Sequence, residues 1–359
     1  MSDVFYAATR KGLFRCERLN TGWKVGKPSF LGEPVTIALP DARDGALYAA
    51  LNLGHFGVKL HRSEDQGATW KELPAPAFDQ VPEGENGPSV KGVWELAAGG
   101  PDQPGWIWAG TAPGGLFLSK DRGESWELID SLWNMPAREK WMGGGTVDPA
   151  LHTILVDPRD SKKLTLGVSC GGVWKSDDAG ASWRNVGQGL RQEYVPPDLA
   201  YDIVTQDVHR LAASAANPNT LWAQHHNGIF VSHDAGETFS EIKDVKPSVF
   251  GFAVAAHPAQ PETAWFAPGV KDECRVPVGD ALVVTRTQDG GKTFEILKSG
   301  LPQQDCYDLI YRHAMEVDDT GQRLAMGSTT GNLWISETGG ESWTHVSGFL
   351  PPIAAVAWV

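Results

Sequence analysis

The sequence lacks several features that would assign it to a common class of protein. It does not begin with a basic segment followed by an apolar one, and no apolar run approaches the ~18 residues that a membrane-spanning helix requires. Lys and Arg total 31 against 44 Asp and Glu, so the formal net charge is −13. Because nucleic acids and anionic membranes bind basic surfaces, we expect neither as the main partner.

Cysteine is scarce, and the common catalytic motifs are missing. The four cysteines, Cys16, Cys170, Cys274 and Cys306, show no Cys-x-x-Cys spacing, so we expect free thiols and a cytoplasmic location. There is no His-Glu-x-x-His, no P-loop and no Gly-x-Gly-x-x-Gly in a βαβ setting. The segment 167–171 contains a Gly-flanked serine, but it lacks the strand–turn–helix context of a nucleophile elbow.

Glycine and tryptophan, in contrast, are abundant: 41 and 15 residues, which indicates tight turns and buried rings between short strands. An eight-residue pattern, Ser/Thr-x-Asp-x-Gly-x-Ser/Thr-Trp/Phe, recurs six times, the last copy with Thr in place of Asp. The copies are spaced 49 to 57 residues apart. Their third positions are Asp65, Asp121, Asp178, Asp234, Asp289 and Thr338.

The residue types of this pattern are those of a self-contained turn. The Asp carboxylate can accept backbone N–H groups of its own loop, and Gly can adopt positive φ. The closing aromatic ring can anchor the following strand. A short apolar strand precedes each copy, as at 115–118, 172–175 and 228–231, so each unit should be a hairpin closed by this turn.

The pattern resembles the Asp-box, or bacterial neuraminidase repeat, of the sialidase-like β-propellers. The third unit contains four strand-like runs, at 151–156, 163–168, 172–175 and 182–186, which is typical of a propeller blade. Runs at 4–9, 12–16 and 23–25 lack an innermost strand that 353–359 could supply. We therefore predict an all-β fold: a single seven-bladed β-propeller domain over residues 1–359, closed by pairing of its N- and C-terminal strands. The alternative is two separate β domains, but the repeat continues along the chain without an interruption or a linker.

The two faces of such a propeller should differ. If each blade runs from an inner strand A to an outer strand D, the Asp-boxes are C–D turns and share a face with short A–B turns. The other face carries long segments at 74–92, 131–150, 187–208, 269–281 and 299–312, and extra loop length usually marks the binding face of a repeat protein. We expect arginines there to hold an anionic group and tryptophans to stack on a sugar. The predicted substrate-binding residues are His55, Trp133, Arg138, Trp141, Arg191, Tyr194, Arg275 and Arg312.

Histidines and carboxylates also gather at this face. Six of the ten histidines map to it or to the strand ends beneath it: His55, His152, His209, His225, His226 and His313. Counting back six residues from the A–B turn gives Glu95, His152 and His313, which we expect at one level of the central channel. The predicted catalytic residues are Glu95, His152, Asp207, His209 and His313, in an acid/base or metal centre. A divalent metal ion is the candidate cofactor, with His152, His209 and His313 as ligands. Alternatively, these groups only hydrogen-bond one another and channel water.

The resemblance implies a hydrolase that acts on a small polar, carbohydrate-class ligand in the central cleft. It does not favour a true sialidase, because Thr9-Arg10-Lys11-Gly12 stands where sialidases carry Arg-Ile-Pro, and sialidases have six blades. Xyloglucanases of this type use two propellers with the cleft between them, and one is present here. A carboxylate pair, Glu83 or Glu85 with Asp148 or Asp202, is a further arrangement for glycoside hydrolysis.

A second hypothesis is a non-catalytic module that docks a protein partner on the long-loop face, as in sortilin-like and photosystem assembly propellers. That function predicts an exposed apolar patch on this face and no convergent buried charges. The sequence leaves the substrate and the oligomeric state open.

Overall fold

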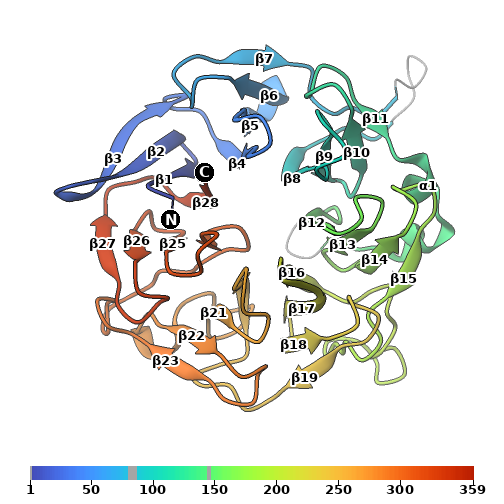
Figure 1. Ribbon diagram of the computed structural model, residues 1–359. Coiled ribbons are helices and arrows are strands. Elements are labelled where there is room, and N and C mark those ends of the chain that lie inside the picture. The colour runs from blue at the N-terminus through green and yellow to red at the C-terminus, as the bar shows by residue number, and fades with distance from the viewer. Residues whose placement is uncertain (1, 80–86, 144–146) are drawn as a thin grey trace.

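In the computed structural model, which describes residues 2–79, 87–143 and 147–359, seven four-stranded antiparallel sheets surround a central axis (Figure 1). The innermost strands (A) are β4 (Val35–Pro40), β8 (Gly92–Ala98), β12 (Leu151–Val156), β16 (Val208–Ser214), β20 (Gly251–Ala256), β24 (Met315–Val317) and β28 (Ile353–Trp358). The second strands (B) are β1 (Val4–Thr9), β5 (Leu47–Asn52), β9 (Ile107–Ala112), β13 (Leu164–Val168), β17 (Asn217–His225), β21 (Ala264–Pro268) and β25 (Leu324–Gly327).

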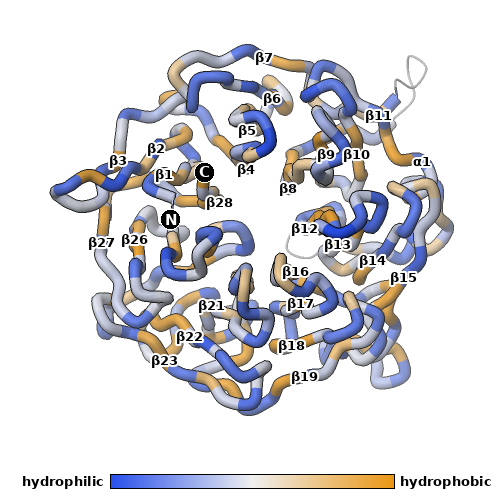
Figure 2. The backbone as a smooth tube through the Cα atoms, viewed as in Figure 1, coloured by the Kyte–Doolittle hydropathy of each residue, from blue (hydrophilic) through white to orange (hydrophobic). Residues whose placement is uncertain are grey.

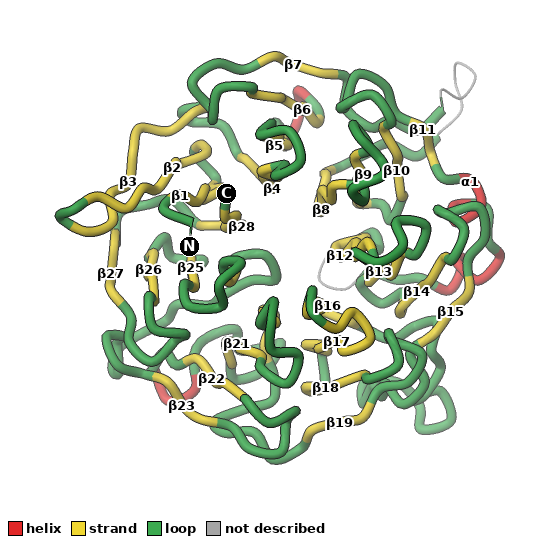
Figure 3. Tube along the Cα trace, in the orientation of Figure 1, coloured by secondary structure: helices red, strands yellow, loops and turns green. Residues whose placement is uncertain are grey.

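Most sheets end in a short outermost strand that is more exposed than the inner ones. The third strands (C) are β2 (Gly12–Leu19), β6 (Val58–Ser63), β10 (Leu116–Ser119), β14 (Gly172–Ser176), β18 (Gly228–Ser232), β22 (Val284–Thr287) and β26 (Leu333–Ser336). The outermost (D) are β3 (Gly22–Ser29), β7 (Lys71–Leu73), β11 (Glu127–Leu128), β15 (Arg184–Val186), β19 (Ser240–Ile242), β23 (Glu295–Leu297) and β27 (Thr344–Ser347). Among the described residues, helix is limited to α1 (Asp130–Trp133) and the 3₁₀ turns η1 (Gly54–Phe56), η2 (Pro136–Lys140) and η3 (Val278–Asp280), as Figure 3 shows.

The ring closes as predicted. The C-terminal β28 is the innermost strand of the sheet that β1, β2 and β3 complete, and Ala7 pairs with Val356 in its antiparallel register. Both termini therefore lie beside the axis (Figure 1). Pairing the two ends leaves no open seam between the first and last blades, which removes an exposed sheet edge.

The apolar core lies within and between the sheets. Hydrophobic stretches follow the strands and hydrophilic ones mostly the loops (Figure 2). Trp108, Trp174, Trp222 and Trp265 are among the largest fully buried side chains, which confirms the expectation of buried rings. None of the four cysteines forms a disulfide, and only Cys274 is exposed. Among the described residues, no helix has the length and apolar character needed to cross a membrane.

The repeated turn has the predicted geometry. In the third copy, Asp178 Oδ1 accepts the Ser182 N–H at 2.8 Å, and Asp178 Oδ2 accepts the Ser182 hydroxyl at 2.6 Å. The Ser176 hydroxyl bonds to the same carboxylate at 2.8 Å and accepts the Gly180 N–H at 2.8 Å. Ala179 and Gly180 take φ of 58° and 88°, the left-handed conformation that favours Gly. Each turn therefore satisfies its own polar groups.

Candidate functional site

Six of the seven inner strands contain a bulge near the cavity end. A register shift leaves one residue without a partner on the second strand: Thr36 in β4, Trp94 in β8, His152 in β12, His209 in β16 and Ala354 in β28. In β20 the shift spans Phe252 and Ala253. Because a bulge re-aims the side chain of the extra residue, it is a common device beside functional sites.

Most of these bulge residues, but not His152, line a central cavity of about 700 Å³. Thr36, Trp94, His209, Phe252 and Ala354 all contribute to its wall. The other lining residues come from B–C turns and D–A crossovers, so the cavity opens on the face opposite the Asp-boxes. They include Arg10, Cys170, Tyr194, His226, Arg275 and Arg312.

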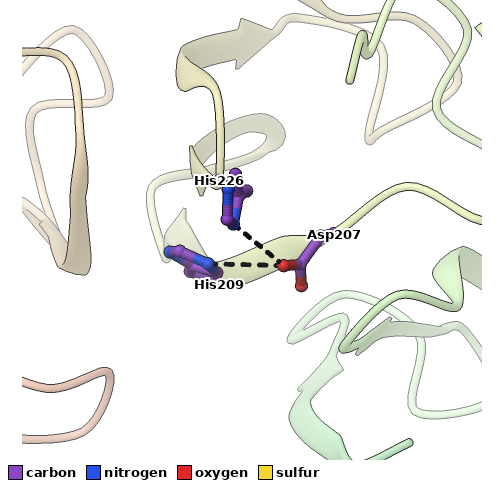
Figure 4. Close-up of side chains that lie close together, drawn as sticks. All are labelled: Asp207, His209 and His226. Carbon is purple, nitrogen blue, oxygen red and sulfur yellow. Dashed lines mark ion pairs between the residues drawn. The ribbon is translucent and has the colours of Figure 1, made fainter. Parts of the chain in front are cut away.

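One wall of the cavity carries a carboxylate between two imidazoles (Figure 4). Asp207 Oδ2 lies 3.2 Å from His226 Nδ1 and 3.5 Å from His209 Nε2. Asp207 and His209 flank the first residue of β16, and His226 follows β17 in its turn to β18. Because β16 and β17 are antiparallel partners, with Val208 opposite His225, the three side chains meet at one strand end. We call these three residues the Asp207 group.

The Asp207 group is held from outside by backbone and ring contacts. The Cys170 N–H donates to Asp207 Oδ1 at 3.2 Å, and His209 Nδ1 lies 2.7 Å from the Gly251 carbonyl oxygen. The His209 ring stacks on Phe252, with centroids 4.3 Å apart and planes 12° from parallel. These contacts leave His209 and Asp207 little freedom to rotate.

Burial and mutual contact shift the acidities of the Asp207 group in different directions. Burial opposes ionisation of Asp207, but His209 and His226 hold the pKa of its carboxyl well below the usual range. Burial lowers the pKa of His209, although Asp207 acts in the opposite sense. Burial also acts to lower the pKa of His226, but its bond to Asp207 outweighs burial and raises it. The group therefore contains an ionised carboxylate beside two imidazoles of unlike basicity.

Arg312 brings a cation to the same cavity, where the Asp207 carboxylate acts on it electrostatically without a direct ion pair. Its guanidinium lies over the rings of Phe252 and Trp94, at 5.3 and 5.6 Å from their centroids. Its Nε is buried without a hydrogen-bond partner, and within the described ranges no carboxylate lies at ion-pair distance from it. Burial lowers the pKa of Arg312. Arg275, in contrast, pairs with Asp272 at 2.6 Å.

A second polar cluster lies beside the Asp207 group. His313 Nε2 is 3.2 Å from Glu95 Oε2, and Arg210 Nη1 donates to the same oxygen. Burial acts to raise the pKa of Glu95, but Arg210 and His313 lower it overall. Glu95 and His313, which the six-residue count from the A–B turn placed at one level of the channel, are therefore in contact. His313 also lines the cavity.

The structure does not bring His152, His209 and His313 together as one set of metal ligands. The His152 side chain is fully buried, with Nε2 2.7 Å from the Val208 carbonyl and Nδ1 3.0 Å from Thr153 Oγ1. Only its backbone carbonyl reaches His313, at 2.9 Å. The imidazole of this bulge residue bonds to the neighbouring β16 and not to the axis. The acidic and histidine side chains that converge instead are Asp207, His209 and His226.

Of the predicted substrate-binding residues, Tyr194, Arg275 and Arg312 line the cavity. The other five do not line it, because four of them contact other residues and His55 is exposed. Trp133 packs on Phe78 at 4.3 Å, beneath the Arg138 guanidinium at 3.2 Å. Trp141 is 7% exposed and packs on Trp174, Arg191 pairs with Glu241 at 3.0 Å, and His55 is exposed beside Phe56.

Of the carboxylates suggested for glycoside hydrolysis, Asp148 and Asp202 do not line this cavity. Glu83 and Glu85 lie outside the described residues, and Asp148 and Asp202 each pair with a lysine. Several cavity residues were missed by sequence reasoning, among them His226 and Trp94. His226 was expected on this face but not as a member of the centre, and the antiparallel pairing of 208 with 225 was the signal. Trp94 gave no signal, because bulges leave no mark in the sequence pattern.

Comparison with known proteins places the chain among propellers of known structure. No family model matches it. A probable oligoxyloglucan-reducing end-specific xyloglucanase of Neosartorya fischeri is 25% identical over 333 residues, which cover 82% of this chain but 38% of that protein. The GH74 xyloglucanase of Xanthomonas campestris superposes with a TM-score of 0.64 at 17% identity, over 96% of this chain and 52% of that one. YCF48 bound to D1 peptide superposes with a TM-score of 0.53 at 12% identity, over 88% and 82%.

These likenesses support the propeller fold directly and a function only in general terms. The chain spans 38% of the length of the fungal relative and about half that of the solved xyloglucanase. The two neighbours differ in kind, since one is named for a carbohydrate and the other is bound to a peptide.

Proposed function

We propose that this chain is a hydrolase of the sialidase-like Asp-box superfamily, which acts on a small polar, carbohydrate-class substrate in the central cavity. The observation that carries the proposal is the Asp207 group on the wall of a cavity of about 700 Å³. A buried ionised carboxylate that orients two imidazoles is suited to activating water, and titratable groups with strongly shifted pKa values cluster at functional sites.

The rest of the cavity suits a substrate that has an apolar ring face and also carries a charged or strongly polar group. Trp94 and Tyr311 offer aromatic surfaces on which the apolar face of a sugar can stack. Arg312 can hold an anionic or strongly polar substituent, since none of the described carboxylates forms an ion pair with it and its Nε has no hydrogen-bond partner. The xyloglucanase relatives support the carbohydrate class.

The test is turnover on a panel of aryl glycosides, uronides and xyloglucan oligosaccharides, measured as released aglycone or reducing ends. We expect hydrolysis of at least one member and a loss of at least ~100-fold in kcat for Asp207→Asn. Asp198→Asn is the matched control, because Asp198 is an exposed carboxylate of the same crossover and does not line the cavity. Absence of turnover across the panel by folded protein would contradict the proposal.

The second candidate, docking of a protein partner on the cavity face, has its own supporting observation. Large apolar side chains exposed on the described surface concentrate in the loops of this face. They include Leu31 at 81%, Phe56 at 77% and Phe349 at 98% exposure. The convergent buried charges in the cavity favour the hydrolase, whereas the exposed apolar residues around it favour a protein partner that covers this face. If docking is the function, Leu31→Ser with Phe349→Ser should abolish partner capture while Asp207→Asn leaves it unchanged.

A further inference from the structure

The Asp207 group has the composition of a metal site. We propose that Asp207, His209 and His226 bind one divalent transition-metal ion of the zinc class, with open coordination positions toward the cavity. Metal binding does not depend on the proposed hydrolysis, but its use to activate water does. In the part of the chain that the structure describes, this is the one group of His, Cys, Asp or Glu whose ligand atoms all lie within 4.8 Å of one another.

Two of the three distances between the ligand atoms match shared coordination, and the third, between the two imidazole nitrogens, is at most 4.8 Å. Zinc–nitrogen and zinc–oxygen bonds of ~2.0–2.2 Å place neighbouring ligand atoms about 3.0–3.5 Å apart in octahedral or tetrahedral geometry. Asp207 Oδ2 lies 3.2 Å from His226 Nδ1 and 3.5 Å from His209 Nε2. Two imidazoles and one carboxylate are a donor set that zinc and ferrous iron favour.

The hydrogen bonds around the group fix which atoms face one another. A carbonyl oxygen can only accept, so His209 Nδ1, at 2.7 Å from the Gly251 oxygen, carries the hydrogen. In the neutral ring, Nε2 then presents a lone pair to Asp207 Oδ2, an acceptor facing an acceptor. A cation between the two atoms turns this repulsion into coordination. The alternative is a proton on Nε2, and the experiment below separates the two.

The outer contacts are those that usually orient metal ligands. Ligating histidines commonly donate their second ring N–H to a carbonyl, as His209 does to Gly251. The other oxygen of Asp207 accepts the Cys170 N–H at 3.2 Å, which leaves Oδ2 for the ion. Stacking on Phe252 holds the His209 ring. Because three protein ligands leave positions open, a bound water could face the substrate with a lowered pKa, as in catalytic zinc sites.

The test measures metal binding without reference to activity. Protein stripped with a chelator is titrated with Zn²⁺ by calorimetry, and with Co²⁺ by visible absorption. We expect one equivalent per chain, a Zn²⁺-dependent rise in the unfolding temperature, and a loss of at least 100-fold in affinity for His226→Gln. His226 is only half-buried, so this variant should fold. His233→Gln is the control, because His233 is exposed in the Asp-box of the same sheet.

Several outcomes would overturn the metal site: no saturable binding by the wild-type protein, equal affinity in His226→Gln, or an equal loss in His233→Gln. The two proposals can fail separately. Binding without turnover on the glycoside panel removes the hydrolase and keeps the metal site. Turnover by chelated protein with no saturable binding removes the metal site and keeps the hydrolase, with Asp207 and its histidines as a proton-sharing group.

Discussion

The two faces of the propeller use polar residues in opposite ways. On the Asp-box face, the same turn recurs, and each carboxylate accepts three hydrogen bonds from within its own loop, as Asp234 does from Ser232 and Thr238. On the cavity face no loop repeats another, and polar atoms remain without partners, such as Arg312 Nε. Polar groups satisfied locally stabilise the fold, whereas groups left unsatisfied by their own loop remain available to a ligand.

The largest expected effect is on the cavity face. Arg312→Gln should raise the KM for an anionic substrate by about 10–100-fold, the scale of one charge-assisted contact. Arg159→Gln should leave KM unchanged, because Arg159 lies on the Asp-box face and already pairs with Asp157 at 2.6 Å. Steady-state kinetics on a charged and a neutral substrate would check this. An equal effect on both substrates would show that Arg312 supports the wall and does not bind charge.

On the opposite face, removal of a turn carboxylate should affect stability alone. Asp234→Ala eliminates three hydrogen bonds, from the Ser232 hydroxyl, the Thr238 N–H and the Thr238 hydroxyl. We expect the free energy of unfolding to fall by about 1–2 kcal/mol, since the turn is exposed to water. Denaturant unfolding gives the loss, and kcat should stay at the wild-type value. A drop in kcat of the folded variant would contradict the view that this face only stabilises the fold.

Between the faces, Glu316 on β24 should make stability depend on pH. Burial raises its pKa from 4.5 to about 7, although it accepts the Trp358 N–H at 2.8 Å. Between these two values the folded state keeps a proton that the unfolded state releases, so stability falls as pH rises through this window and is level above it. Glu316→Gln should remove this dependence and gain on the order of 1–3 kcal/mol at pH 8 relative to wild type.

Urea unfolding of both proteins at pH 5, 6 and 8 checks this expectation. The informative quantity is the difference between the two proteins, because other groups that titrate contribute equally to both. A difference that stays constant with pH would mean that Glu316 is ionised in the folded state throughout.

The smallest effect should come from repairing the sixth turn. Thr338 stands where the other copies have Asp, and its one hydroxyl meets the Ser342 N–H at 2.9 Å and the Ser342 hydroxyl at 3.0 Å. Thr338→Asp would supply two acceptor oxygens, and we expect a gain of under about 1 kcal/mol. Thermal unfolding beside Asp234→Ala would measure it. A loss of stability would show that this copy has adapted to threonine.

Much of the architecture was predictable because it depends on local chemistry. The Asp-box turns and the strands between them follow from residues within a few positions of one another. The closing pair of β1 and β28 followed from counting strands, and the cavity face followed from loop length. The site was predictable only in part: Asp207 and His209 were named, but His226 was not placed with them and His152 was expected to point inward.

The sequence by itself determined the repeating turn, the four-stranded unit and the closure of the ring, because contacts within one unit repeat down the chain. Only the tertiary structure decided which side chains meet at the axis. That depends on bulges at His152, His209 and their counterparts, which turn one residue per strand by an amount that no periodic pattern records. It also depends on contacts between blades, such as His209 with Gly251, whose partners are far apart in the chain.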